Sequence, residues 1–223
     1  VVFQPQDTAE LQTAVDLWVS DNASALSTYG EINTWDVSLI TDMGELFRDK
    51  PTFNDDISSW DVSNVTSMDI MFLNASAFNQ DLNNWDVENV INMSQMFQGA
   101  TSFNGNISSW DVSNVENMQA MFSIATSFNG DISSWEVVSA VNMSYMFYEA
   151  DSFNQDISSW TVQDGANLEN MFWFADGLSD ENKCAIHTTF SSNDSWPYNW
   201  SSLCTSVVFQ PQDTAELQTA VDL

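Results

Sequence analysis

The chain has 223 residues, of which 43% are hydrophobic and 13% aromatic, so it can bury a sizeable core and is not a disordered acidic tail. Its 32 Asp and Glu residues face only 3 Lys and Arg, which gives a formal net charge of -29. This charge argues against binding to nucleic acid or anionic membranes, because both would be repelled. It favours cations, cationic partners or solubility in a salty medium.

The first predicted element is an amphipathic helix over residues 7–19, within an N-terminal helical cap of residues 1–30. Asp7 followed by Glu10 resembles a capping box. Three apolar residues share one face of this helix: Leu11, Val15 and Trp18. Repeat proteins need such a cap to shield the first coil. The segment lacks the pattern of a signal peptide or a membrane span, so any export signal is expected outside it.

Residues 31–178 form six repeats of 25 residues, each marked by a tryptophan. The tryptophans are Trp35, Trp60, Trp85, Trp110, Trp135 and Trp160. Fixed spacing without insertions is typical of a solenoid, in which stacked coils bury a continuous core. The period is too short for a WD-repeat propeller blade, despite the recurring Trp-Asp pairs.

Each coil carries two apolar patterns. Trp60 and Val62 are two residues apart, as on one face of a strand. Four residues then follow at the spacings of a short helical or 3₁₀ arc: Met68, Met71, Phe72 and Ala75. We therefore predict an α/β solenoid with one short parallel strand and one short helical or 3₁₀ arc per coil, capped at both ends.

The pattern I-x-x-W-x-V-x-x-V is similar to the L-x-x-L-x-L-x-x-N of leucine-rich repeats, with Trp and Val in place of Leu. The fuller phrase DISSWDVSNVTSM, followed by MF and FNQD, resembles the BspA-like leucine-rich-repeat surface proteins over residues 31–178. This resemblance implies a cell-surface or extracellular setting and adhesive or structural work. It implies no catalytic residue.

The last coil departs from the repeat, with Thr161 in place of the recurring Asp and Gly165 in place of the recurring Val. Residues 179–206 then hold the only two cysteines, Cys184 and Cys204. We expect a disulfide that closes a loop of roughly 20 residues and staples a C-terminal cap, worth about 3 kcal/mol in the loop-entropy model. The alternative is two buried free thiols in a cytosolic protein.

Residues 207–223 repeat residues 1–17 letter for letter, as VVFQPQDTAELQTAVDL. The offset of 206 residues is not a multiple of 25, so it is a second and larger period. We interpret the sequence as a window on a tandem array of nearly identical modules, with 207–223 as the start of the next one. The alternative is an artificial extension of the natural chain.

An acidic residue follows the tryptophan in the first five coils. These residues are Asp36, Asp61, Asp86, Asp111 and Glu136. On stacked strands they would form an outward column with a spacing of roughly 4.8 Å, in which neighbours repel. Bound Ca²⁺ would relieve this repulsion. The alternatives are a solvated column that accepts backbone or serine hydrogen bonds and a docked basic partner, and no D-x-D-x-D-G calcium loop is present.

Asparagine and N-x-S/T patterns also recur. One asparagine per coil is expected to form a buried ladder that satisfies turn amides of its own and the next coil: Asn54, Asn79, Asn104, Asn129 and Asn154. Eight sequons are candidate N-glycosylation sites: Asn22, Asn64, Asn74, Asn92, Asn106, Asn142, Asn193 and Asn199. A chain rich in Asn and Ser makes several by chance, so only a few need carry a glycan.

The sequence offers little support for a catalytic function. His187 is the only histidine and is expected to be structural, which leaves no catalytic triad and no zinc cluster. The repeated acids occupy equivalent positions, unlike the paired carboxylates of glycosidases. We therefore expect no enzyme and no cofactor apart from Ca²⁺.

Two hypotheses for the function follow. The first is a structural protein of an extracellular filament or surface appendage, in which neighbouring copies of the module are the partners. The second is a cell-surface adhesin that uses the acidic face to bind Ca²⁺ or a partner.

Overall fold

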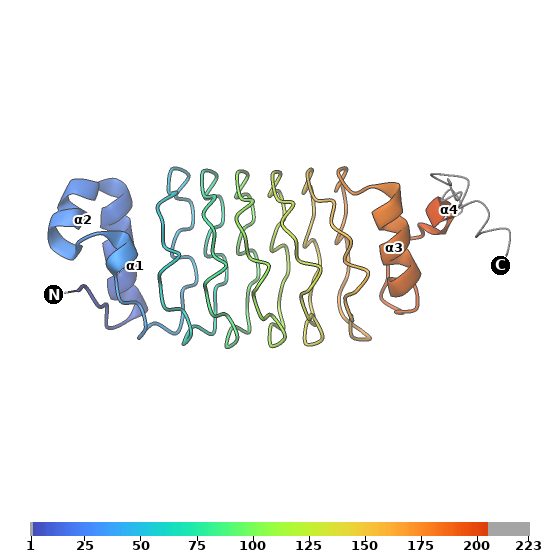
Figure 1. Ribbon diagram of the computed structural model, residues 1–223, viewed down its shortest axis with the longest axis horizontal. Helices are drawn as coiled ribbons and strands as arrows, with labels where there is room; N and C mark the ends of the chain where they lie inside the picture. The colour runs from blue at the N-terminus through green and yellow to red at the C-terminus, as the bar shows by residue number, and fades with distance from the viewer. Residues whose placement is uncertain (1, 205–223) are drawn as a thin grey trace, which may run out of the picture.

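The computed structural model describes residues 2–204, in which 25-residue coils stack side by side between helices at the two ends (Figure 1). The helices are α1 (Thr8–Ser20), α2 (Asn22–Tyr29), the short 3₁₀ helix η1 (Ile32–Thr34), α3 (Asp180–Phe190) and α4 (Ser201–Cys204). Helices α1 and α2 lie at the N-terminal end of the stack, and α3 lies beside the last coil. The predicted module start at 207–223 lies outside the described residues.

Helix α1 begins where the capping pattern predicts. The Asp7 side chain accepts a hydrogen bond from the backbone N–H of Glu10 at 2.9 Å, which satisfies a donor of the first turn. The residues predicted to share one face are buried: Leu11, Val15 and Trp18. Helix α2 was not predicted. It starts directly after Asp21, whose side chain accepts a hydrogen bond from the backbone N–H of Ser24 at 3.1 Å.

The described residues contain no β-strand and no sheet, so the predicted α/β solenoid with a strand in each coil is wrong. One residue per coil forms isolated parallel bridges with its equivalents in the neighbouring coils: Asp42, Ser67, Asn92, Asn117, Asn142 and Asn167. The stretch at Trp60 and Val62 turns instead of extending, because the N–H of Trp60 bonds to Ile57 O at 3.1 Å and that of Val65 to Val62 O at 2.9 Å.

The predicted helical arc is also wrong, because this part of the coil is a run of turns. The N–H of Met71 bonds to Met68 O at 3.3 Å, which reproduces the three-residue spacing of a 3₁₀ helix. However, Ile70, the third residue of this turn, has a φ of 62°, as in a type II turn. Two positions per coil have positive φ: Glu45, Asp49, Ile70, Asn74, Gln95, Gly99, Ala120, Ile124, Tyr145, Glu149, Asn170 and Phe174.

These turns send alternate backbone N–H groups to the next coil. In the second coil, four N–H groups donate to carbonyl oxygens of the third coil at 2.8 to 2.9 Å: those of Met68, Ile70, Phe72 and Asn74. Equivalent bonds recur further along, such as the one from Ala120 N–H to Ser144 O at 2.8 Å. We call the segment of each coil that carries these bonds, residues 67–74 in the second coil, the turn face.

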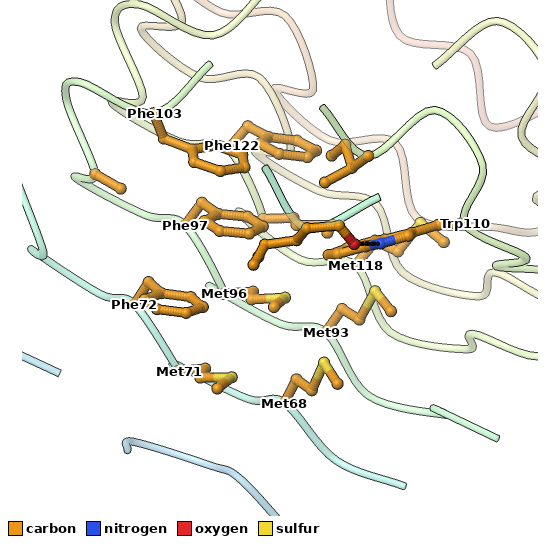
Figure 2. Close-up of a cluster of buried hydrophobic side chains, with 14 of the residues drawn as sticks. Met68, Met71, Phe72, Met93, Met96, Phe97, Phe103, Trp110, Met118 and Phe122 are labelled. Carbon is orange, nitrogen blue, oxygen red and sulfur yellow. Dashed lines mark hydrogen bonds between the residues drawn. The ribbon is translucent and has the colours of Figure 1, made fainter. Parts of the chain in front are cut away.

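The core consists of columns of like side chains that run through the stack (Figure 2). The rings of Phe72 and Phe97 lie 5.4 Å apart and 1° from parallel, and those of Trp85 and Trp110 lie 6.4 Å apart and 2° from parallel. All four side chains are buried. Each large apolar side chain contributes about 1.5–3 kcal/mol on burial, and the columns leave no coil with a core of its own.

The spacing between coils can be tested by comparing alanine substitutions at Gly105 and at its equivalent in the next coil, Gly130. A Cβ on Gly105 would collide with the carbonyl oxygen of Gln80 in the preceding coil, whereas a Cβ on the equivalent Gly130 would lie 3.8 Å from Gly105 O. We expect Gly105→Ala to reduce the free energy of unfolding by about 1–3 kcal/mol through overpacking. Gly130→Ala should cost less, because its nearest contact is the edge of the Phe128 ring at 3.0 Å and not a colliding backbone carbonyl.

Thermal and denaturant unfolding of the two variants, followed by near-UV circular dichroism, would measure the difference. Equal destabilisation at the two glycines would show that the coils do not pack as described.

Candidate interaction surfaces

The tryptophan column joins the coils through side chains. The indole N–H of Trp110 donates to Leu82 O in the preceding coil at 2.8 Å (Figure 2), and that of Trp85 donates to Ile57 O at 3.1 Å. Tryptophan suits this position because it combines a large apolar surface with one N–H donor. Trp35, in the first coil, instead donates to Gly30 O at 3.2 Å.

The asparagines after the coil phenylalanine form a continuous ladder. Oδ1 of Asn54 accepts the backbone N–H of Asn79 at 2.8 Å, and the same bond recurs from coil to coil. At its end, Oδ1 of Asn154 accepts the N–H of Ser179, the N-cap of α3, at 2.9 Å. The ladder therefore also orients the C-terminal cap. These asparagines are exposed and not buried as predicted, because the turns that carry them lie at the surface.

Four of the five acids that follow the tryptophans, all except Glu136, accept hydrogen bonds within their own turns. Oδ1 of Asp61 accepts the N–H and the hydroxyl of Ser63 at 3.1 and 2.6 Å, and Asp111 accepts the N–H of Ser113 at 3.0 Å. Asp86 accepts the N–H of Glu88 at 3.2 Å. The remaining two members of the predicted column differ in exposure, Asp36 being half-buried and Glu136 exposed.

Hydrogen bonding favours the ionised form of two of these carboxyl groups, those of Asp36 and Asp111. The Ser113 hydroxyl, followed by its backbone N–H, lowers the pKa of Asp111, and Ser38 lowers the pKa of Asp36 in the same way. In the part of the chain that the structure describes, no group of three or more His, Cys, Asp or Glu side chains is placed to hold a metal ion. The Ca²⁺ hypothesis thus has no preformed site among these residues.

The candidate glycosylation sites differ in access. Asn193 is only 8% exposed, and its Nδ2 donates to Gln163 O at 3.0 Å, which is incompatible with a glycan in the folded state. Asn64 and Asn74 are exposed, but their Nδ2 groups bond to the preceding coil. Asn92 and Asn142 are half-buried, whereas three more sites are exposed: Asn22, Asn106 and Asn199.

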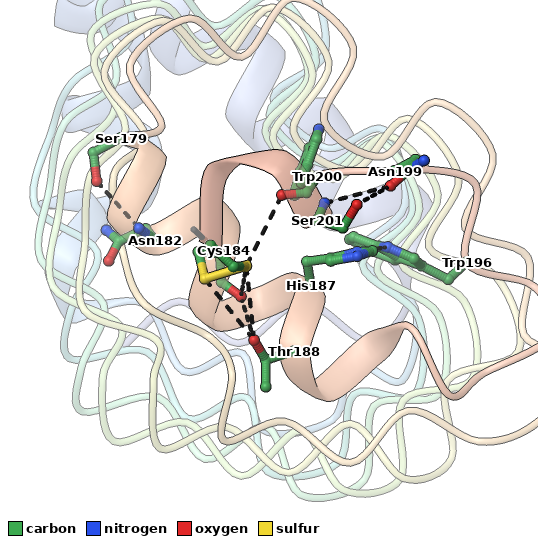
Figure 3. Close-up of a disulfide and its surroundings, with 10 residues drawn as sticks. Ser179, Asn182, Cys184, His187, Thr188, Trp196, Asn199, Trp200 and Ser201 are labelled. Carbon is green, nitrogen blue, oxygen red and sulfur yellow. Dashed lines mark hydrogen bonds between the residues drawn. A yellow bond between two sulfur atoms is a disulfide. The ribbon is translucent and has the colours of Figure 1, made fainter. Parts of the chain in front are cut away.

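The C-terminal cap covers the open end of the core. Cys184 in α3 and Cys204 in α4 form a disulfide (Figure 3). Three aromatic rings of the cap contact Phe172 of the last coil: Trp196, Tyr198 and Trp200. His187 accepts the indole N–H of Trp196 at Nδ1, at 3.0 Å, so it has a structural partner.

An exposed aromatic cluster over the last coils was not predicted. The Tyr148 ring lies 6.0 Å from Trp173 and 6.1 Å from Phe174, in both cases edge to face. Trp173 and Phe174 are 47% and 51% exposed. The signal available in the sequence is that Tyr148 and Trp173 occupy the position that holds Gln98 in an earlier coil.

These features define a capped repeat protein of stacked coils. The chain matches the family model described as "Mycoplasma protein of unknown function, DUF285" over residues 17–115 and 83–184, and it belongs to this family. The family is associated with BspA-like surface repeat proteins, whereas the specific leucine-rich-repeat motif is not confirmed. No curated protein and no solved structure matches the chain. None of the described helices has the length and apolar character needed to cross a membrane.

The serine bonds of the acidic residues predict a pH dependence. The folded-state pKa of Asp111 lies below its ordinary value of 3.8, so its stabilising contribution is present above that value and is lost as the pH falls through the folded-state pKa. We expect Ser113→Ala to raise the pKa of Asp111 and to reduce stability at pH 7, with a smaller loss once the pH has fallen through the folded-state pKa. NMR titration of the carboxyl carbon, with Ser113→Thr as the hydroxyl-retaining control, would measure this. An unchanged pKa in the alanine variant would contradict the assigned cause.

The disulfide is expected to stabilise the cap locally. Replacing Cys184 and Cys204 together by Ser should cost about 3 kcal/mol of cap stability, because the loop constraint on the unfolded state is lost. Hydrogen exchange should accelerate in α3 and α4 but not at Ile70 or Phe72, whose N–H groups bond to the third coil. The wild-type protein under reducing conditions serves as the control. Equal acceleration throughout the coils would contradict a local role.

Proposed function

We propose that this chain is a structural unit of an extracellular surface protein, in which modules with a period of 206 residues follow one another in tandem. The observation that carries the proposal is the 17-residue identity between 1–17 and 207–223, which chance does not produce. In the first copy, part of this sequence forms α1, the helix that caps the stack. A second copy of the same sequence is what the start of another module requires.

The architecture supports a load-bearing role. Hydrogen bonds and aromatic columns run along the stack, so each coil is held by its neighbours. Helices cover both ends, and buried residues of the two caps, such as Leu11 and Ile186, join the core. Because the apolar ends are covered, tandem modules would keep separate cores and follow one another as discrete units along a filament or appendage.

Two observations support an extracellular location. The disulfide between Cys184 and Cys204 is of a kind that persists in oxidising compartments. The family to which the chain belongs is associated with surface repeat proteins.

The net charge bears on how neighbouring molecules associate. With 32 acidic and 3 basic residues, they would repel one another, which would limit uncontrolled lateral association. The proposal involves no enzymatic activity.

The native protein provides the test. We expect protease treatment of intact cells to release it, intact-mass measurement to give a polypeptide longer than one module, and electron microscopy to show an axial repeat of one module. A cytosolic protein of the same abundance is the control for cell lysis. A natural polypeptide with a single module, or a protein protected from protease in intact cells, would contradict the proposal.

A further inference from the structure

An open groove of about 310 Å³ crosses the turn face of the third to sixth coils. Six of its lining residues carry the argument: Gln95, Gln98, Gln119, Tyr145, Tyr148 and Trp173. We call it the aromatic–amide groove. It spans four coils, so it is extended along the stack.

The groove arises where the turn face stops repeating. Core positions keep the same residue type from coil to coil, whereas the equivalents of Tyr148 in earlier coils are Arg48, Leu73, Gln98 and Ser123. Gln95 and Tyr145 occupy a left-handed position of the turn, with φ of 56° and 59°. Their backbone N–H groups bond to the next coil, so the groove has a rigid floor.

The lining has an unusual charge for this molecule. The chain has a net charge of -29, yet no Asp, Glu, Lys or Arg lines this groove. On the same face, the first coil carries Glu45, Arg48 and Asp49. In the fifth coil, Glu149 is the equivalent of Asp49, and its carboxylate accepts a hydrogen bond from the Tyr148 hydroxyl beside the groove. This carboxylate is engaged by Tyr148, no acidic side chain lines the groove itself to hold a cation, and no basic side chain lines it to hold an anion. The expected ligand is therefore neutral.

The amide groups supply paired hydrogen bonds. Each glutamine offers a carbonyl acceptor and an NH₂ donor. Nε2 of Gln95 donates to Oε1 of Gln98, which orders both side chains. Within the described residues, this pairing leaves Oε1 of Gln95 and Nε2 of Gln98 for other partners. One acceptor and one donor on this pair of side chains suit a ligand that carries hydroxyl groups.

The aromatic rings supply flat apolar surfaces beside the amides. Asn170 Nδ2 donates to the hydroxyl oxygen of Tyr145 at 2.9 Å and fixes that ring, while Tyr148 packs edge to face against Trp173 at 6.0 Å. Trp173 remains 47% exposed. Rigid aromatic side chains with polar tips bind ligands that have one apolar face and hydroxyl groups at the edge. Sugar rings have this character.

We propose that the aromatic–amide groove binds a neutral oligosaccharide, with the sugar rings against Tyr148 and Trp173 and their hydroxyl groups bonded to the glutamine amides. The extended groove fits several linked sugars better than a single one. This proposal does not depend on the tandem arrangement, because all of the lining lies within one module.

The test uses tetrasaccharides of glucose, galactose, mannose and N-acetylglucosamine as probes, with a heparin tetrasaccharide and choline as charged comparisons. Isothermal titration and the indole N–H signal of Trp173 in NMR spectra report binding. We expect at least one neutral tetrasaccharide to bind with a Kd of about 1 mM or tighter and to shift that signal. Absence of binding by all neutral probes, or preferential binding of choline or heparin, would overturn the proposal.

Variants then locate the site. Trp173→Ala and Tyr148→Ala should each weaken binding at least tenfold. Leu73→Ala, at the equivalent position of the second coil and outside the groove, should leave it unchanged. Unchanged melting of each variant confirms the fold. Equal affinity of the groove variants and the wild-type protein would place the sugar elsewhere and overturn the proposal.

Discussion

The left-handed backbone at two positions of every coil is the constraint on which the rest of the structure depends. Residues other than glycine adopt it at a conformational cost, and β-branched residues resist it most. Yet only Gly99 among these twelve positions is glycine, and Ile70 and Ile124 are both β-branched. In the first five coils the conformation persists because it points alternate N–H groups at the next coil, where they find carbonyl partners at 2.7 to 3.0 Å.

Because of this constraint, each coil has two parts that are held to the neighbouring coils in different ways. On the turn face, backbone hydrogen bonds hold the coils together and do not depend on side-chain identity. Elsewhere, cohesion depends on particular side chains, because the indole of Trp110 and the amide of Asn79 reach the neighbouring coil. The second part must therefore repeat in sequence, whereas outward side chains on the turn face are free to vary. The aromatic–amide groove lies where they vary most.

The sequence predicted the 25-residue period, the core positions and the helix after Asp7, because apolar spacing reports burial directly. It could not predict the local backbone. Buried Trp60 and Val62 flank exposed Asp61, which matches a strand, although the chain there consists of turns. Met68 and Met71 are three residues apart, which matches a 3₁₀ helix, but the positive φ of Ile70 breaks it. Residue spacing alone does not reveal the sign of φ.

The most direct measurement of this account is site-resolved amide hydrogen exchange by NMR in the second and third coils. The turn ladder predicts slow exchange at Ile70, Phe72 and Asn74 and fast exchange at Ser63, whose N–H bonds only to an exposed carboxylate in the described structure. Slow exchange at residues 61–63 with fast exchange at 68–74 would indicate a strand beside the tryptophan and would contradict the account.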